Sequence, residues 1–124
     1  MMKQVSVFAD AGSLPPGQRP SLNEERLSPE EASRVATYLE AGAVVAHTTM
    51  RGVDVLADDA PVVPLTARTD GEFLWTGPVT YYVRTYGVAP DAEFLAHVRA
   101  RDYAPRVPSD SEVEAAAKEF AEAD

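Results

Sequence analysis

The stretch VVPLTARTDGEFLWTGPVTYYVRTY, residues 62–86, decides the fold of this chain. Two short apolar runs, 62–68 and 72–75, flank the pair Asp70-Gly71. An Asp-Gly pair in this position predicts a β-hairpin, because both residue types tolerate positive φ. The chain's one Trp and three of its five Tyr also lie in this stretch. The sequence therefore predicts an aromatic hairpin that leads into a helix, at the centre of the structure.

Four helices are predicted from capping residues and apolar spacing. Ser28-Pro29-Glu30-Glu31 supplies a cap, a proline for the first helical position and a glutamate that completes a capping box. Apolar residues then recur at helical spacing in each segment. The other three helices are expected to begin at Gly77-Pro78, at Pro90-Asp91 and at Ser109, the last forming an acidic C-terminal helix over 109–124.

Short β-rich runs lie between these helices, at residues 4–9, 43–48 and 53–56, the last of which fits a brief strand or a helical turn. The segment 10–27 contains proline and glycine and is expected to be a loop. Strands and helices do not alternate regularly. We therefore expect the α+β fold class, with a small antiparallel sheet of three to four short strands packed against about four helices. A chain of 124 residues fits a single domain over 1–124.

The chain is acidic, with a formal net charge of −9 from 11 basic and 20 acidic residues. Residues 107–124 hold one basic and six acidic residues and carry −5 of this charge. Such a chain repels nucleic acid and anionic membranes, and it attracts a basic partner. The lack of Cys excludes disulfides and thiolate chemistry. We find no signal peptide and no apolar run of membrane-spanning length, which predicts a cytoplasmic protein.

No catalytic motif is found, since the sequence has no GxSxG, no P-loop and no GxGxxG. His47 and His97 lie fifty residues apart without metal-ligand spacing, and His97 is expected to be solvated beside Arg99. Turn chemistry explains three aspartates that lie near turns, Asp58, Asp59 and Asp70. The sequence therefore favours a protein that is not an enzyme, and it predicts no catalytic residue, no cofactor and no metal.

Two sets of residues are candidates for binding another protein. Tyr81 and Arg84 lie off the apolar face of their helix and three residues apart, so both can point into solvent. Tyr and Arg are enriched in binding hot spots. The second set is the carboxylates of the acidic helix, which either cover a cationic site on a partner or only keep the helix solvated: Glu114, Glu119, Glu122 and Asp124.

The segment 68–105 resembles a pattern in small uncharacterised actinobacterial proteins. The resemblance is carried by Arg68-Thr69-Asp70-Gly71-Glu72-Phe73-Leu74-Trp75, Tyr81-Tyr82, Tyr86-Gly87-Val88, Pro90 and Phe94-Leu95-Ala96-His97. Phe73 stands where the family pattern has Trp. The shared elements are structural, so the resemblance implies a fold and no activity. Some similar small acidic bacterial proteins are encoded as immunity partners of secreted toxins, which is an association only.

Three functional hypotheses follow. The first is a non-enzymatic bacterial binding protein, an inhibitor or immunity protein that occludes a basic toxin or enzyme. The second is a small-ligand-binding domain or enzyme with a pocket between the sheet and Tyr81, Tyr82 and Trp75. The third is a structural or regulatory subunit that self-associates through the edge of the hairpin. The net charge and the lack of catalytic motifs favour the first hypothesis.

Overall fold

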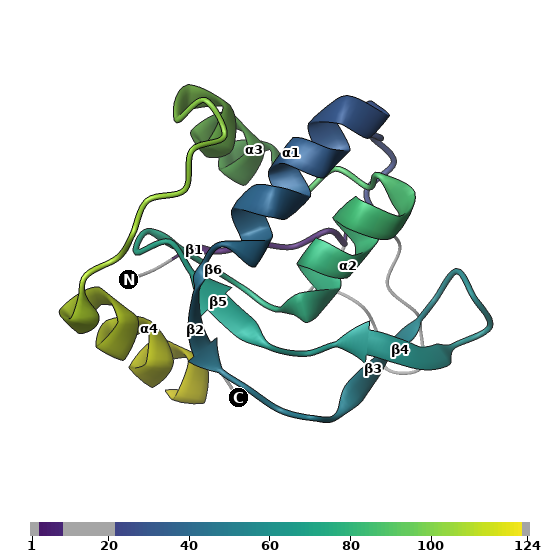
Figure 1. Ribbon diagram of the computed structural model, residues 1–124. Helices are drawn as coiled ribbons and strands as arrows, with labels where there is room; N and C mark the ends of the chain where they lie inside the picture. Colours follow the sequence, from purple (N-terminus) through teal and green to yellow (C-terminus); the bar gives the residue numbers. More distant parts are fainter. Residues whose placement is uncertain (1–2, 9–21, 123–124) are drawn as a thin grey trace.

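The computed structural model describes residues 3–8 and 22–122. Most of the loop expected over 10–27 therefore lies outside the described residues, as do Asp124 and the side chain of Glu122. The described chain has the predicted α+β fold, with four helices, a four-stranded sheet and a separate two-stranded ribbon (Figure 1).

The four-stranded sheet has the strand order β1-β6-β5-β2. β5 (Ala67–Thr69) and β6 (Phe73–Trp75) are the antiparallel strands of the predicted hairpin, and β2 (Ala43–Ala46) pairs antiparallel with β5. β1 (Lys3–Gln4) lies parallel to β6, so the sheet is mixed. β1 is shorter than the strand expected over 4–9, although two of the apolar residues that follow it are buried.

The expectation that the apolar run 62–68 forms one strand of the hairpin is wrong. β4 (Ala60–Pro64) pairs antiparallel with β3 (Arg51–Asp54) in the ribbon, and β5 begins only at Ala67. Pro64 has no N–H to donate to a ladder, so the first strand ends there and the chain leaves the ribbon for the sheet. The ribbon projects from the body at the lower right of Figure 1.

The turn between β5 and β6 also differs from the expected one. The strand register makes Gly71 and Glu72 its two central residues, and of the turn residues only Gly71 has positive φ, at +98°. Asp70 acts through its side chain instead. Its Oδ1 accepts hydrogen bonds from the backbone N–H groups of Glu72 at 2.9 Å and Phe73 at 2.8 Å. The Asp-Gly signal therefore finds the hairpin but misplaces its centre by one residue.

All four predicted helices are present. They are α1 (Pro29–Glu40), α2 (Gly77–Tyr86), α3 (Ala92–Ala100) and α4 (Asp110–Glu122). α2 ends as expected at Gly87, whose φ of +70° is the left-handed conformation of a helix C-cap. α1 packs against both α2 and α3, and α4 packs against β2 at the edge of the sheet (Figure 1).

The two predicted capping boxes form to different extents. At α4, Ser109 Oγ accepts from the N–H of Glu112 at 3.2 Å and the Glu112 carboxylate accepts from the N–H of Ser109 at 2.8 Å, so the box is complete. At α1, Ser28 Oγ accepts from the N–H of Glu31 at 3.1 Å, but the Glu31 carboxylate binds Arg99 of α3. The second half of that box is therefore replaced by a contact between helices.

The core lies between the helices and the sheet. Its largest fully buried side chains are aromatic: Trp75, Tyr38, Tyr82 and Phe94. The Nε1–H of Trp75 donates to the carbonyl of Leu39 at 3.1 Å, which satisfies its polar edge inside the core. The aromatic stretch that predicts the fold therefore also supplies its centre.

Candidate functional site

A groove of about 300 Å³ lies beside α2, between the end of α1 and the chain that joins β4 to β5. It is lined by charged and hydroxyl side chains, a proline and a glycine: Glu40, Pro64, Thr66, Arg68, Gly77, Thr80, Tyr81, Arg84 and Thr85. The second hypothesis expected a pocket in this region lined by Tyr81, Tyr82 and Trp75. Of those three residues only Tyr81 lines the groove, because Tyr82 and Trp75 are fully buried.

Gly77 allows the first turn of α2 to close one side of this groove. A Cβ atom built on Gly77 would lie 1.8 Å from the carbonyl oxygen of Pro64. Only glycine permits the backbones of α2 and β4 to approach so closely. The same residue that marks the helix start in the sequence therefore also fixes the helix against the ribbon.

The groove brings Tyr81 and Arg84 together, but both have partners inside the protein. Nε and Nη2 of Arg84 donate to the two carboxylate oxygens of Glu40 at 2.8 Å each. The hydroxyl of Tyr81 donates to Oδ2 of the buried Asp54 at 2.6 Å. The polar end of Tyr81 therefore points inward, contrary to the expectation that it points into solvent, whereas Arg84 remains about half exposed.

Asp54 is a buried carboxylate that sequence reasoning missed, since none of its side-chain surface is exposed. Its Oδ2 also accepts from the hydroxyl of Tyr86 at 2.7 Å, and its Oδ1 accepts from the N–H of Leu56 at 2.8 Å. Burial alone would raise the pKa of Asp54, but the hydrogen bonds from Tyr81 and Tyr86 hold it below its ordinary value. The bond to Asp54 in turn raises the pKa of Tyr86 to about 12. One charge and two phenols therefore fasten the ribbon to α2.

A second buried cluster joins α1, the β5–β6 turn and α3. Asp70 is 2% exposed, and its Oδ2 accepts from the hydroxyl of Tyr38 at 2.5 Å and lies 2.9 Å from Nε2 of His97. The other ring nitrogen of His97 lies 3.4 Å from a carboxylate oxygen of Glu72, and its ring packs on Phe73 with 4.7 Å between centroids. The expectation that His97 is solvated is therefore wrong, since its side chain is only 17% exposed.

The chemistry of this second cluster is that of a structural support. Burial alone would raise the pKa of Asp70, but the hydrogen bonds from Tyr38 and from the turn amides hold it below its ordinary value. Burial and the bond to Asp70 both raise the pKa of Tyr38. Both ring nitrogens of His97 face carboxylates of the protein itself, so neither is directed at a bound molecule as a general acid or base would be.

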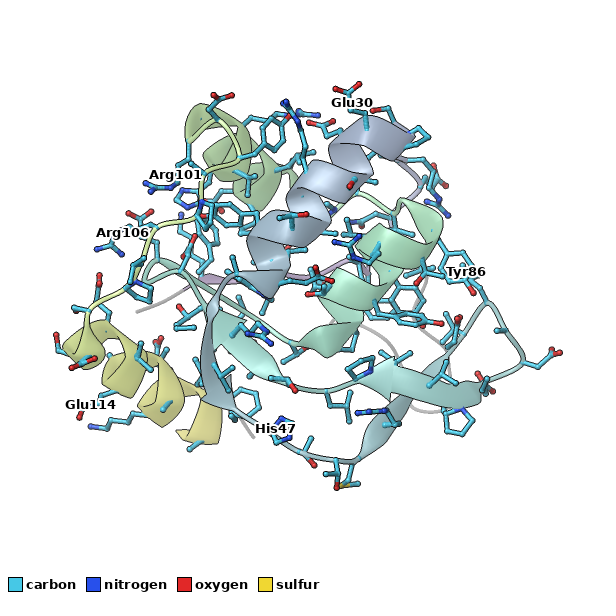
Figure 2. All side chains as sticks on the ribbon, in the orientation of Figure 1. Glu30, His47, Tyr86, Arg101, Arg106 and Glu114 are labelled. Carbon is cyan, nitrogen blue, oxygen red and sulfur yellow. The ribbon has the colours of Figure 1, made fainter. Side chains whose placement is uncertain are left out.

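Ion pairs neutralise part of the positive charge in the described chain. The pairs are Lys3–Glu93, Arg84–Glu40, Arg99–Glu31 and Arg106–Glu112. Exposed carboxylates remain at Asp58 near the end of the ribbon and at Asp110 and Glu114 on α4, where Figure 2 shows Glu114 on the outer side of the helix. Glu119 lies on the same helix and is half-buried. These carboxylates contribute to the formal net charge of −9.

The ribbon exposes a group of apolar side chains, which we call the ribbon patch: Met50, Val53, Leu56 and Val62, between 49% and 70% exposed. Side chains alternate between the two faces of a strand. The opposite face of the ribbon carries Val63 and Asp54, which are buried against the body. Val53 and Val62 therefore lie on the open face of the ribbon, opposite the face that is fastened to α2, and Met50 and Leu56 lie beyond the two ends of β3.

Stability should fall steeply as the pH drops from about 4.5 to about 2. Hydrogen bonds from Arg99 and Tyr103 lower the pKa of Glu31 from 4.5 to about 2. The unfolded chain therefore takes up a proton in this interval that the folded chain does not, and stability present above pH 4.5 is lost as the pH falls through the folded pKa. Chemical denaturation at successive pH values measures the loss. Glu31→Gln should flatten the curve below pH 4.5, and an unchanged curve would contradict this assignment.

In residues 3–8 and 22–122, no group of three His, Asp or Glu side chains is placed to hold a metal ion, and no helix there is long and apolar enough to cross a membrane. No protein-family model, curated protein or solved structure matches the chain. The features that bear on function are therefore the groove, the ribbon patch and the acidic α4.

Proposed function

We propose that this protein is a non-enzymatic, cytoplasmic bacterial binding protein that inhibits a basic partner, as an immunity protein inhibits a toxin. The observation that carries the proposal is the ribbon patch. Its four apolar side chains are about half or more exposed, and two of them, Val53 and Val62, lie on the open face of the ribbon in a molecule of net charge −9. Clustered exposed apolar side chains mark surfaces that bind other molecules.

The charge of the chain favours a basic partner. α4, with the carboxylates of Asp110 and Glu114, lies along the same lower edge of the molecule as the ribbon in Figure 1, and the segment 47–50 connects β2 to the ribbon. An apolar centre with a charged rim is the usual anatomy of a protein interface. Carboxylates at the rim speed the encounter with a basic surface and oppose an acidic one.

The mechanism of inhibition would be occlusion. The ribbon patch would cover apolar surface of the partner, and the carboxylates of α4 would face its basic site. Of the predicted binding residues, Glu114 and Glu119 belong to this surface in the proposal, whereas Asp124 and the side chain of Glu122 lie outside the described residues. Tyr81 and Arg84 contribute less to it, because their polar groups already bind Asp54 and Glu40.

The proposal is tested with the products of the neighbouring genes in the native host. Each is produced in a laboratory bacterium with and without this chain. We expect one product to be basic and toxic, its toxicity to be relieved by this chain, and the purified complex to weaken as salt rises from about 0.05 to about 0.5 M. Val53→Asp combined with Val62→Asp should weaken the complex at least tenfold, because both changes place a charge in the buried centre.

Val107→Asp is the matched control, because Val107 is 90% exposed on the link between α3 and α4 and lies outside the ribbon patch. This variant should protect as well as the parent. A neutral partner bound independently of salt, or full protection by the double variant, would overturn the proposal. A homodimer that the double variant dissociates would overturn it in favour of the self-associating subunit.

A further inference from the structure

We infer that the groove beside α2 binds a small organic carboxylate, and that Arg68 is the residue that holds the carboxylate group. This inference goes beyond the proposed function and does not depend on it. The groove has a volume of about 300 Å³, which is at the small end of the range for ligand pockets. An anion-binding groove is not expected from the composition alone, because the whole chain carries a net charge of −9.

Arg68 has N–H donors that can still bind a ligand. Its Nη1 donates to the carbonyl of Gly42 at 2.9 Å, and no carboxylate in the described part of the chain forms an ion pair with it. A guanidinium carries five N–H donors in a planar fork that matches the two oxygens of a carboxylate. The bond to Gly42 holds the side chain in place, so less rotamer freedom is lost when a ligand binds.

Arg84 and Glu40 set the charge that the groove accepts. Their bidentate pair is nearly neutral, so the two arginines and one glutamate of the lining leave the groove with a formal charge of +1. A single negative charge compensates this excess. A dianion such as phosphate would bring a second negative charge close to the Glu40 carboxylate, which repels it. The groove therefore favours a monocarboxylate over phosphate.

The rest of the lining suits the same ligand. Gly77 places the first turn of α2 in the groove, where the backbone carries partial positive charge, and Thr76 makes no side-chain cap to this turn. Thr80 offers a hydroxyl for a polar substituent, and the Pro64 ring and the Tyr81 ring line the groove with apolar surface. A carboxylate attached to a small ring or short chain satisfies all of these surfaces.

The inference is tested by titrating the full chain with benzoate and following the backbone amide signals by NMR. We expect saturable shifts of Thr66, Thr80 and Arg84, with a dissociation constant of about 1 mM. Benzamide, which has the same shape without the charge, should bind at least tenfold more weakly, and so should inorganic phosphate. Benzamide or phosphate binding as tightly as benzoate, or no saturable shift, would overturn the inference.

Three variants complete the test. Arg68→Gln should weaken benzoate at least tenfold. Arg101→Gln is its control, because Arg101 is similarly half-buried and donates to one backbone carbonyl, that of Ala104 at 3.3 Å, outside the groove (Figure 2). Glu40→Gln should strengthen the binding of benzoate, since it frees Arg84 from its ion pair. This expected change is opposite in sign to that of Arg68→Gln, so it tests the inference even if the Arg68→Gln protein fails to fold. Equal weakening by Arg68→Gln and Arg101→Gln, or weaker binding to Glu40→Gln, would overturn the inference.

Discussion

Replacing Asp70 by Ala should lower the free energy of unfolding by about 3 to 5 kcal/mol. The change removes the acceptor for the Tyr38 hydroxyl at 2.5 Å and for the turn amides of Glu72 and Phe73, and it leaves the ring nitrogen of His97 without its partner at 2.9 Å. The bonds from Tyr38 and Phe73 are buried, and those of Glu72 and His97 are partly buried. Each buried donor left unpaired costs about 1 to 3 kcal/mol, so the sum exceeds the effect of an ordinary surface substitution.

Urea denaturation near pH 7 measures this loss, with two further variants for comparison. Asp70→Asn should be intermediate, because the amide oxygen can still accept from the turn or from Tyr38 but cannot serve both. Glu72→Gln changes the exposed carboxylate that lies 3.4 Å from His97 at the edge of the cluster, and it should stay within about 0.5 kcal/mol of the parent because exposed ion pairs contribute little. If Asp70→Ala were no less stable than Glu72→Gln, the cluster would not support the fold as described.

Asp70 also shows how far the sequence predicts this structure. Its role in the turn follows from local chemistry, because an aspartate before glycine can accept bonds from amides two and three residues ahead. Its other oxygen binds Tyr38 and His97, which lie far away in the sequence on two different helices. Periodicity identifies each helix but does not give the rotation and distance at which helices meet. The same limit explains why His97 was expected in solvent.

The pairing of β3 with β4 was missed for a different reason, although a brief strand was one of the two alternatives for 53–56. The run 62–68 has the composition of a single strand, and only Pro64 within it hints at a break. Asp54 is a charged residue between two apolar ones, Val53 and Val55. In an alternating strand this pattern predicts that the charged residue is exposed and its apolar neighbours are buried. In the structure that alternation is reversed. Asp54 is buried because Tyr81 and Tyr86 approach it from α2, while Val53 is half exposed.

The groove could not be predicted either, because α1, α2 and the β4–β5 connection each contribute to it. The sequence does identify two of the residues that line the groove. Tyr81 and Arg84 are predicted to lie off the apolar face of their helix, and the structure places both in the lining of the groove. Their partners Asp54 and Glu40 lie far from α2 in the sequence. The sequence therefore could not predict that Tyr81 and Arg84 form hydrogen bonds inside the protein.

Replacing Gly77 by Ala should lower the free energy of unfolding by about 3 kcal/mol, although helix propensity alone predicts a gain of up to about 1 kcal/mol. The new Cβ would lie 1.8 Å from the carbonyl oxygen of Pro64 and 2.4 Å from its carbonyl carbon. These are backbone atoms of β4, so no rotamer change relieves the clash, and α2 must move away from the ribbon.

That movement would also stretch the hydrogen bonds that join α2 to the ribbon through Asp54, which adds to the loss. Gly52→Ala is the matched control, because the closest atom to its Cβ would be the end of the flexible Leu65 side chain at 3.0 Å, and Val63 Cβ at 3.7 Å would be in ordinary van der Waals contact. It should remain within about 0.5 kcal/mol of the parent. Thermal and urea unfolding of both variants measure the difference. A Gly77→Ala protein as stable as the Gly52→Ala protein would show that α2 and β4 are not in the close contact on which the shape of the groove depends.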